Sequence, residues 1–443
     1  MAGGTWLSQN KVRPGAYINF KAIPKSSMTV GDRGIVAMGL PLSWGAEGKL
    51  IEVLSSDLLD GNSKKLVGFT AFDSDSKLLA GALSYCYKAL VYRIDAGGTK
   101  ATATIGDMVS TAKYKGTFGN KITIAVVENP TDLFTVTTYV DGEVVDTQKV
   151  ALISELESND YVDFSGTGDF AETAGTALTG GTNGTVTDST AYTALFNLLK
   201  MARFQTYACF SNSSDVKADV ATFIQQLRDD EGRYVQAVVA DYDGADYEGI
   251  INSVNSVVID DVTFSKEDFV AIVAGMTAGA NFNQSNTARK INGATQIVNE
   301  MTDAEIKAGL QAGKFIISTS ANGDIKVEQD INSHHTFTKA KPYVFSKNRV
   351  IRTLDEIGTS TKITWETAYM GKVDNNEMGR DLFKADLMAY GNEMMRLNGI
   401  QNFSGVDDIS VAQGKDIDSV LCDWRVQPVD SMEKLYMTVS VDA

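Results

Sequence analysis

The sequence predicts an α/β core, an inserted β-rich domain and a C-terminal α+β domain. Strand-like and helix-like segments alternate through residues 188–345, which favours a mainly parallel sheet covered by helices. Residues 99–187 instead carry short strand-like runs separated by turn residues. Residues 23–98 have a helix and strands of their own. We therefore expect a discontinuous core, 23–98 plus 188–345, with 99–187 inserted into it.

The first 22 residues are expected to form an extended N-terminal arm. Pro14 and Gly15 mark a turn or breaker, and Ile18 and Phe20 alternate with polar positions behind it. Nothing before Pro14 has the periodicity that would bury one face. This segment therefore has the character of an arm and not of a core element.

The core segments follow the expected order of strands and helices. Residues 34–40 and 89–95 are predicted strands, and 76–90 a predicted helix. Ser265 and Asp268 have capping-box spacing at the start of another helix. The remaining predicted core elements are helices at 189–202, 215–229 and 265–279, strands at 204–210, 234–240 and 256–260, and a hairpin about Asn322-Gly323.

The insertion has the clearest β pattern. Its predicted strands are residues 121–128, 133–140 and 143–150. Asp141-Gly142 joins the last two, and both residues tolerate the positive φ of a tight hairpin turn. A glycine-rich linker, 175–186, leads back to the core.

The C-terminal domain, 346–443, begins with two predicted amphipathic helices at 346–357 and 376–400. The second has one apolar stripe, made of Phe383, Leu387, Tyr390, Met394 and Leu397. Two strands are predicted to follow. The first, 419–427, has Val420, Cys422, Trp424 and Val426 on one face.

The last predicted strand, 434–441, alternates cleanly. Its apolar face carries Leu435, Met437, Val439 and Val441. On pattern alone, this strand can fold back on 419–427 as a hairpin across residues 428–433, or it can pair with another chain.

Composition narrows the class of protein. The net charge of −16 makes nucleic acid or an anionic membrane a poor partner, because phosphate affinity depends on Lys and Arg. No apolar run approaches the length of a membrane span, and no signal peptide is evident. The three cysteines, Cys86, Cys209 and Cys422, are expected to be buried free thiols. We expect a protein made in the cytoplasm.

The search for chemistry yields no catalytic residue, no metal ligand set and no cofactor motif. His334 and His335 are adjacent, so on a strand they would point to opposite sides. The glycine-rich residues 179–185 lack the lysine and hydroxyl of a phosphate loop. The strongest alternative is a metal-dependent enzyme using Asp241, Asp243 and Asp246 after a strand, although Asp246 can also cap a helix that begins with Tyr247.

Several stretches together resemble the contractile tail sheath proteins of bacteriophages and phage-tail-like particles. The similarity is greatest to the branch of Gram-positive myophages, defective prophages and R-type bacteriocins such as the diffocins. The stretches, which keep the family's order over nearly the whole chain, are residues 10–20, 112–126, 178–184, 273–287, 345–357, 371–388 and 426–441.

The resemblance implies a non-catalytic core with a subtilisin-like fold. It implies subunits that stack as hexameric rings around an inner tail tube and contract from a metastable extended state, driving the tube through the target envelope. It also implies terminal arms that enter neighbouring subunits and complete a β-sheet. The implied partners are the chain itself, the tube protein, and baseplate and tail terminator proteins, in a particle assembled in the bacterial cytoplasm.

Carried onto this sequence, the resemblance names four groups of residues. The C-terminal arm and its acceptor strand are the two alternating segments above. The N-terminal arm would use Val12, Pro14, Gly15, Tyr17, Ile18 and Phe20. A tube-facing helix would present Arg380, Lys384 and Arg396. The alternatives are the metal-dependent α/β enzyme and a cell-surface structural protein.

Overall fold

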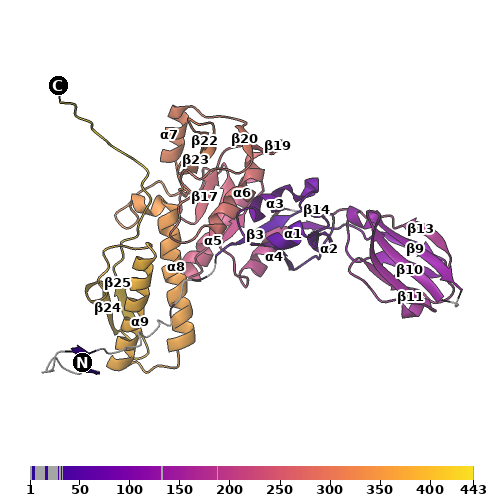
Figure 1. The fold of residues 1–443 in the computed structure, drawn as a ribbon, viewed down its shortest axis with the longest axis horizontal. Coiled ribbons are helices and arrows are strands. Elements are labelled where there is room, and N and C mark those ends of the chain that lie inside the picture. Colours follow the sequence, from indigo (N-terminus) through magenta and orange to yellow (C-terminus); the bar gives the residue numbers. More distant parts are fainter. Residues whose placement is uncertain are drawn as a thin grey trace. The chain divides into compact units, whose positions relative to one another are not determined.

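The computed structural model describes residues 2–4, 15–17, 28, 31, 33–130, 133–186 and 188–442 (Figure 1). The chain forms two compact units. The core unit contains residues 32–359 and 429–443, and the C-terminal unit contains 1–31 and 360–428. None of the helices in the described residues combines the length and the apolar character needed to cross a bilayer.

A seven-stranded sheet forms the centre of the core unit, in the order β21-β17-β16-β15-β3-β5-β4. Neighbouring strands run parallel, except for the antiparallel edge pair of β4 and β5. β3 pairs with β15 although the β-rich insertion separates them in sequence, so the sheet uses strands from both sides of the insertion. The strands are β3 (Ile35–Leu40), β4 (Leu50–Leu54), β5 (Lys88–Arg93), β15 (Thr206–Ala208), β16 (Gln236–Ala240), β17 (Ile250–Ser253) and β21 (Lys314–Phe315).

Both faces of this sheet are buried under helices. Val36 and Met38 of β3 point into one hydrophobic core, and Ile35 and Ala37 point into the other. Such two-sided burial explains why β3 is a continuous apolar run instead of an alternating one. The first core includes α3 (Lys77–Leu83) and α6 (Lys266–Gly279), and the second includes α4 (Asp188–Leu199) and α5 (Ser214–Gln225).

Helix α6 is the most deeply buried helix element of the core unit. The predicted capping box is confirmed: the Asp268 amide donates to Ser265 Oγ at 3.1 Å, and the Ser265 amide donates to Asp268 Oδ2 at 3.2 Å. Gly275 and Gly279 face the end of α3, where an added Cβ would lie 2.3 Å from the Ala82 carbonyl oxygen and 1.9 Å from that of Tyr85. These two glycines therefore permit the close approach of α3 and α6.

The insertion is built from two antiparallel sheets around a third hydrophobic core. Asp141 (φ 51°) and Gly142 (φ 84°) form the predicted tight turn between β10 and β11. A short pair, β6 (Asp95–Ala96) and β14 (Thr185–Val186), joins the two ends of the insertion. The sheets contain β7 (Thr102–Ile105), β8 (Met108–Ala112) and β12 (Val162–Ser165), and β9 (Ile122–Asn129), β10 (Leu133–Val140), β11 (Glu143–Val150) and β13 (Thr173–Ala177).

A buried ion pair lies where the chain passes from the core into the insertion. Arg93 Nη2 lies 2.7 Å from Asp95 Oδ2, and both side chains are almost fully buried. Arg93 also donates to the carbonyl oxygen of Lys115 at 2.7 Å, and Asp95 accepts from the Leu42 amide at 2.8 Å. The Arg93 bond connects β5 with the loop that follows β8 of the insertion, and the Asp95 bond connects β6 with the segment after β3.

Smaller elements complete the core unit. The predicted hairpin about Asn322-Gly323 is confirmed as β22 (Ile317–Thr319) and β23 (Ile325–Val327). A three-stranded sheet contains β18 (Val257–Ile259), β19 (Val262–Phe264) and β20 (Ala294–Ile297). The remaining elements are α1 (Ser55–Leu59), α2 (Ser63–Val67), α7 (Asp303–Gln311), the 3-10 turns Ser74–Ser76, Thr117–Lys121, Ile153–Glu155 and Tyr343–Ser346, and the π turn Gln226–Asp230.

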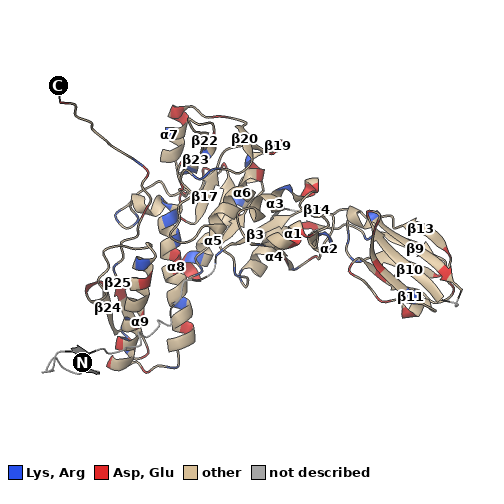
Figure 2. Ribbon diagram, viewed as in Figure 1, with Lys and Arg blue, Asp and Glu red and all other residues tan. Residues whose placement is uncertain are grey.

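Helix α8 (Asn348–Thr364) carries basic and acidic residues interspersed along its length (Figure 2). In the core unit, two of them reach buried partners: Arg352 pairs with Asp330 at 2.5 Å, and Asp355 pairs with Arg228 at 2.7 Å. Because a buried charge is costly without its partner, these pairs fix the first half of α8 against the core.

The C-terminal unit contains the rest of the helical and strand elements. The π turn Trp365–Tyr369 follows α8. The predicted stripe of α9 (Glu377–Arg396) is confirmed for Phe383, Leu387, Tyr390 and Met394, which are buried, whereas Leu397 is half-buried at the helix end. After α10 (Gly405–Asp408), β24 (Ile409–Gln413) and β25 (Val420–Trp424) form an antiparallel pair. Near the start of the chain, β1 (Ala2–Gly4) pairs in parallel with β2 (Gly15–Tyr17).

Two predictions about local structure are wrong. The helix expected after Asp246 is replaced by β17, because Ile250 and Ile251 are needed as a buried strand beside β16. Asp246 therefore does not cap a helix. Cys422 is exposed, unlike the buried Cys86 and Cys209, because the two-stranded sheet leaves the middle of its α9-facing side incompletely covered within the described residues. Of the two pairings left open for residues 434–441, the hairpin does not form within the single chain, since residues 429–442 lie in no strand or helix.

Candidate assembly site

The β24–β25 pair is an incomplete sheet. Its register places Val411 opposite Cys422 and Gln413 opposite Val420. Within the described residues this sheet has two strands only, so each strand has one edge with unpaired backbone donors and acceptors. A two-stranded sheet is marginal by itself, and an unpaired edge is a template for another strand.

Aromatic packing holds this sheet on helix α9. The Trp424 ring lies 6.2 Å from the Tyr390 ring and 6.0 Å from the Phe403 ring. Phe403 in turn fills the place of a missing side chain at Gly391, where an added Cβ would lie 2.4 Å from its ring. One side of the sheet is therefore fixed, while its edges stay open.

The structure places the predicted acceptor residues unevenly. Val420 and Trp424 are half-buried and share the side that packs toward α9, and Cys422 between them is exposed. Val426 lies beyond the end of β25. Arg425, just after the strand, pairs with Asp408 at 2.6 Å and anchors the exit of the chain.

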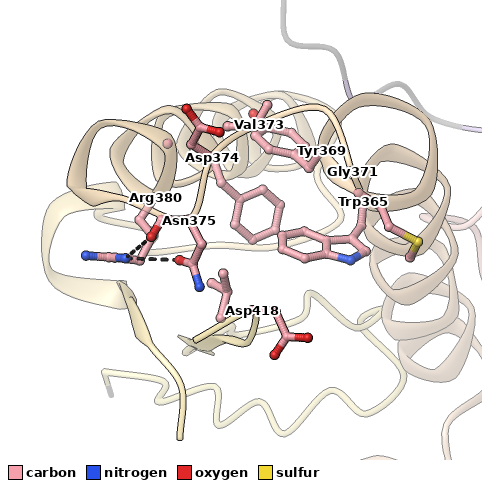
Figure 3. A pocket seen from close by; sticks show the side chains of 12 residues that line it. Trp365, Tyr369, Gly371, Val373, Asp374, Asn375, Arg380 and Asp418 are labelled. Atoms are coloured by element: carbon pink, nitrogen blue, oxygen red, sulfur yellow. Dashed lines mark hydrogen bonds between the residues drawn. The ribbon is translucent and has the colours of Figure 1, made fainter. Parts of the chain in front are cut away.

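A cavity of about 370 Å³ lies beside the start of β25 (Figure 3). The Trp365 and Tyr369 rings form one wall, stacked 6.0 Å apart with 8° between their planes. At the other end, Arg380 Nη1 donates to the Asn375 side-chain oxygen at 3.0 Å. The lining also includes Val420 and Asp418 of the β25 segment, so a strand added along β25 would pass this hollow.

The predicted C-terminal arm is an extended, exposed segment (Figure 1). The exposed fractions of its apolar side chains range from 72% for Val439 to 90% for Tyr436. An exposed apolar run of this length is unusual unless something covers it. No such cover exists within the part of the chain that the structure describes.

The basic residues predicted to face a tube bind to near neighbours. Arg380 donates to Asn375, Lys384 donates weakly to the Val406 carbonyl oxygen at 3.5 Å, and Arg396 pairs with Glu393 at 2.6 Å. The Arg396 side chain keeps 68% of its surface exposed. The structure thus brings the three onto one helix, and their role stays a prediction.

Three family models match successive parts of the chain. The phage tail sheath protein beta-sandwich domain matches residues 96–183, the central domain 184–333, and the phage tail sheath C-terminal domain 340–442. Two Bacillus subtilis proteins match over the whole length of both chains: the uncharacterized protein YqbK with 35% identity, and the phage-like element PBSX protein XkdK with 34% identity. The chain belongs to the phage tail sheath protein family.

Solved structures agree with this assignment. The sheath tail protein of Desulfitobacterium hafniense is 40% identical, with a TM-score of 0.84 over 96% of this chain and 99% of that one. The sheath tail protein of Listeria innocua is 34% identical, with a TM-score of 0.81 over 93% and 96%. The contracted helical sheath of the anti-feeding prophage shares the fold, with a TM-score of 0.58 at 10% identity, over 98% of this chain and all of that one.

The sheath protein is therefore a structural protein and not an enzyme. It is a component of a phage tail or a phage-tail-like particle. Its mixed α/β architecture, with several separate sheets, is that of the family.

The acidic loop of this sheath protein is neutralised by lysines. Asp241 pairs with Lys266 at 2.8 Å, and Asp243 with Lys314 at 3.0 Å. The hydrogen bond from Lys266 lowers the pKa of Asp241. Carboxylates that bind lysines are poor candidates for a divalent cation site, and the described residues contain no group of three metal-ligating side chains.

The two histidines meet at Asp246, because they lie in a loop and not on a strand, where they would point to opposite sides. Asp246 Oδ1 lies 3.3 Å from His334 Nδ1 and 3.5 Å from His335 Nδ1. It also accepts from the amides of His335 at 2.8 Å and Thr336 at 3.2 Å. Burial would raise the pKa of Asp246, but a hydrogen bond from the Thr336 side chain and the two amide bonds outweigh it and lower the pKa to about 2. These contacts hold Asp246 against the loop that contains His334, His335 and Thr336.

The N-terminal arm can be followed only in part. Val12, Pro14, Ile18 and Phe20 lie outside the described residues. Gly15 and Tyr17 belong to β2, which pairs with β1 in the register Ala2 to Gly15. The role of this segment as an arm remains a prediction.

Sequence reasoning missed the residues that support the open sheet. Phe403 and Asp408 carry no periodic signal, because Phe403 lies in an irregular connection after α9 and Asp408 ends α10, a helix of only four residues. The stacked pair of Trp365 and Tyr369 was also missed, since its spacing of four residues looks like ordinary helix and the π turn changes where the rings point.

Proposed function

We propose that this chain is the structural subunit of a contractile tail sheath, linked to its neighbours by exchange of β-strands from its terminal arms. This proposal rests on two exposed features of one chain that each lack a partner within the described residues. Residues 434–441 expose an alternating apolar face, while β24–β25 exposes unpaired strand edges. Strand addition would satisfy both, because backbone hydrogen bonds and alternating side chains are then buried together.

The dimensions of the two partners are compatible. Eight residues of extended chain span about 26 Å, and a five-residue strand such as β25 spans about 17 Å. The arm can therefore cover the whole edge of β25 with residues to spare for its approach. The period-2 pattern would fix the register, since a shift by one residue would turn the apolar face outward.

The energetics favour a polymer over an isolated dimer. Burying each apolar side chain of the arm contributes about 1.5–3 kcal/mol. Association of two molecules costs about 4–15 kcal/mol in lost motion, so a single arm contact gives modest affinity. Contacts repeated around rings and between rings would add through effective concentration, and assembly would then be cooperative.

The proposal extends to the particle. The subunits would stack as hexameric rings around an inner tail tube, meet baseplate and tail terminator proteins at the ends, and contract from a metastable extended state to drive the tube through the target envelope. The anti-feeding prophage baseplate and the contracted extracellular injection system sheath have the same fold, which supports this role. We propose assembly in the bacterial cytoplasm, without nucleic acid and without membrane insertion.

The domain division also belongs to the proposal. We place the core at 23–98 plus 188–345, the insertion at 99–187, and the C-terminal domain at 346–443, with arms at 1–22 and 434–441. The division into compact units, which assigns 429–443 to the core unit, supports treating the last segment separately from β24–β25. The subtilisin-like description of the core stays a prediction.

Deletion of residues 434–443 tests the proposal. We expect a folded protein with an unchanged melting temperature that no longer forms striated tubes in negative-stain electron micrographs. Deletion of residues 442–443 alone is the matched control, because it spares the alternating face, and it should still give tubes. Tubes formed by the longer deletion would refute strand exchange by this arm.

A further inference from the structure

The chain is fastened to the core unit immediately before the exposed arm. The Glu433 carboxylate accepts a hydrogen bond from Thr287 Oγ1 at 2.8 Å and one from Gln329 Nε2 at 2.6 Å. It also binds the Lys347 ammonium group. We call Glu433 and these three partners the arm clamp. The three partners come from separate loops of the core unit.

The ionic part of the clamp is well shielded from water. The Lys347 side chain is 5% exposed and the Glu433 side chain 11%. Asp430 Oδ2 is the other carboxylate near Lys347 Nζ, at 3.8 Å. A buried ammonium group without a close carboxylate is strongly unfavourable, so Lys347 holds Glu433 in place.

The clamp is connected to buried side chains of the core unit. The Thr287 hydroxyl accepts from the Asp330 amide at 2.9 Å while it donates to Glu433. Asp330 is itself buried, pairs with Arg352 of α8 and accepts from Asn348 Nδ2 at 2.9 Å. Force applied to Glu433 would therefore reach the buried contacts of α8 and not a loose loop.

The contrast with the following residues is sharp. Leu435 is 83% exposed and Met437 73%, and residues 434–442 have no strand or helix. Residues 360–428 belong to the other compact unit. The clamp is thus the last fixed point of the chain before the arm.

We propose that Glu433 is the positioning residue of the C-terminal arm. The clamp fixes where the arm leaves the core unit, limits its free length to the residues after 433, and passes the pull of a neighbouring copy directly into the core unit. This inference rests on the proposed strand exchange and deepens it, since it assigns the mechanical anchor of the exchanged strand.

Without the clamp, the free segment would begin after Pro428, which forms a β-bridge with Ile400, and not after residue 433. A longer flexible tether lowers the effective concentration of its end. Loss of the clamp would therefore weaken assembly without removing any residue that pairs with the neighbour. A contact that served only folding stability would lower the melting temperature without changing hydrogen exchange in residues 429–433 or the concentration needed for assembly.

The test compares Glu433→Ala with Asp303→Ala in the full chain. Asp303 also forms an ion pair, with Lys307, but both side chains of that pair are well exposed on α7, so this variant controls for loss of a carboxylate. Hydrogen exchange is first measured on dilute, unassembled protein. We expect the amides of residues 429–433 to exchange at least about tenfold faster in Glu433→Ala, a factor that corresponds to about 1.4 kcal/mol, with α6 and Asp303→Ala unchanged.

Assembly is then measured as the lowest protein concentration that gives tubes. We expect Glu433→Ala to raise it by at least about tenfold, Glu433→Gln to lie between because it keeps an acceptor oxygen, and Asp303→Ala to match the wild type. Unchanged exchange in Glu433→Ala would show that the clamp does not hold this segment. Faster exchange with normal assembly would overturn the positioning role alone. Strand exchange itself fails only if deletion of 434–443 leaves assembly intact, so the two failures are distinguishable.

Discussion

The central sheet and the β24–β25 sheet are built from the same kind of backbone but are completed differently. In the central sheet, strands such as β3 and β16 are buried on both faces, and each has a neighbour on both edges. In the small sheet, Leu421 of β25 is 56% exposed and each strand has one open edge within the described residues. The inner strands of the first sheet have both neighbours within the chain, whereas neither strand of the second sheet has two neighbours within the described residues.

This difference indicates that different parts of one subunit provide folding stability and assembly contacts. Burial in the central sheet stabilises the fold before any partner arrives. The apolar surface of the arm contributes nothing to the isolated subunit, because it stays in water. Substitutions in the two regions should therefore separate into those that change folding and those that change assembly.

The largest expected effect comes from the core. Phe269 of α6 is fully buried in the first hydrophobic core, and Phe269→Ala should lower the free energy of unfolding by about 3–5 kcal/mol through lost burial and the remaining cavity. Denaturant unfolding followed by circular dichroism measures this. Ile417→Ala, at a side chain 85% exposed in the C-terminal unit, is the control and should change the value by less than about 0.5 kcal/mol.

The next effect lies in the arm and should leave folding alone. Met437→Asp places a charge on the alternating apolar face, and Thr438→Asp places the same charge on the opposite face. We expect Met437→Asp to raise the concentration needed for tube formation by at least about tenfold, or about 1.4 kcal/mol, and Thr438→Asp to change it far less. Equal effects of the two would mean that the face of the strand does not matter. Neither should alter the melting temperature, because both side chains are exposed in the subunit.

The smallest effect concerns the arm clamp at Glu433 and depends on pH. Burial would raise the pKa of Glu433, but hydrogen bonds from Lys347, Gln329 and Thr287 outweigh it and hold the pKa below its ordinary value of 4.5. A lowered pKa in the folded protein means that the stabilisation is present above pH 4.5 and disappears as the pH falls through the lowered value.

This sign can be measured with Glu433→Gln. The melting temperature of this variant should be about 2 °C lower than that of the wild type at neutral pH. The difference should shrink as the pH falls below 4.5. Lys347 pairs with both Glu433 and Asp430. A difference that persists at low pH would mean that the effect does not come from the charge of Glu433.

Much of the fold could be predicted because local signals agreed with tertiary structure. The strands around Asp141-Gly142, the capping box at Ser265 and the stripe of α9 all follow from residue spacing. β17 could not be predicted, because its residues are read as a strand only once β16 lies beside them. Pairing with β16 determines that this segment is a strand. Asp246, which looks like a helix cap in the sequence, instead binds the amides of a loop.

The candidate site was predictable only in part for a related reason. The alternation of residues 435–441 is visible in the sequence, so the arm could be proposed. Glu433 gave no such signal, because its partners Thr287, Gln329 and Lys347 lie 146, 104 and 86 residues away. Such contacts appear only when the chain is folded.

Strand exchange can be tested most directly through a native thiol. Cys422 is exposed on β25, whereas burial raises the pKa of Cys86 to about 12 and that of Cys209 to about 11, which keeps these two unreactive. Single cysteines would be placed in turn at Leu435, Met437, Val439 and Val441, and assembled protein would be oxidised. Cysteines on strands that pair side by side are close enough for a disulfide.

We predict that at least one of the four arm cysteines forms a disulfide with Cys422 of another copy, giving covalent chains on a non-reducing gel that vanish when Cys422→Ser is added. Tubes that assemble normally and yet give no bond between copies at any of the four positions would contradict the account.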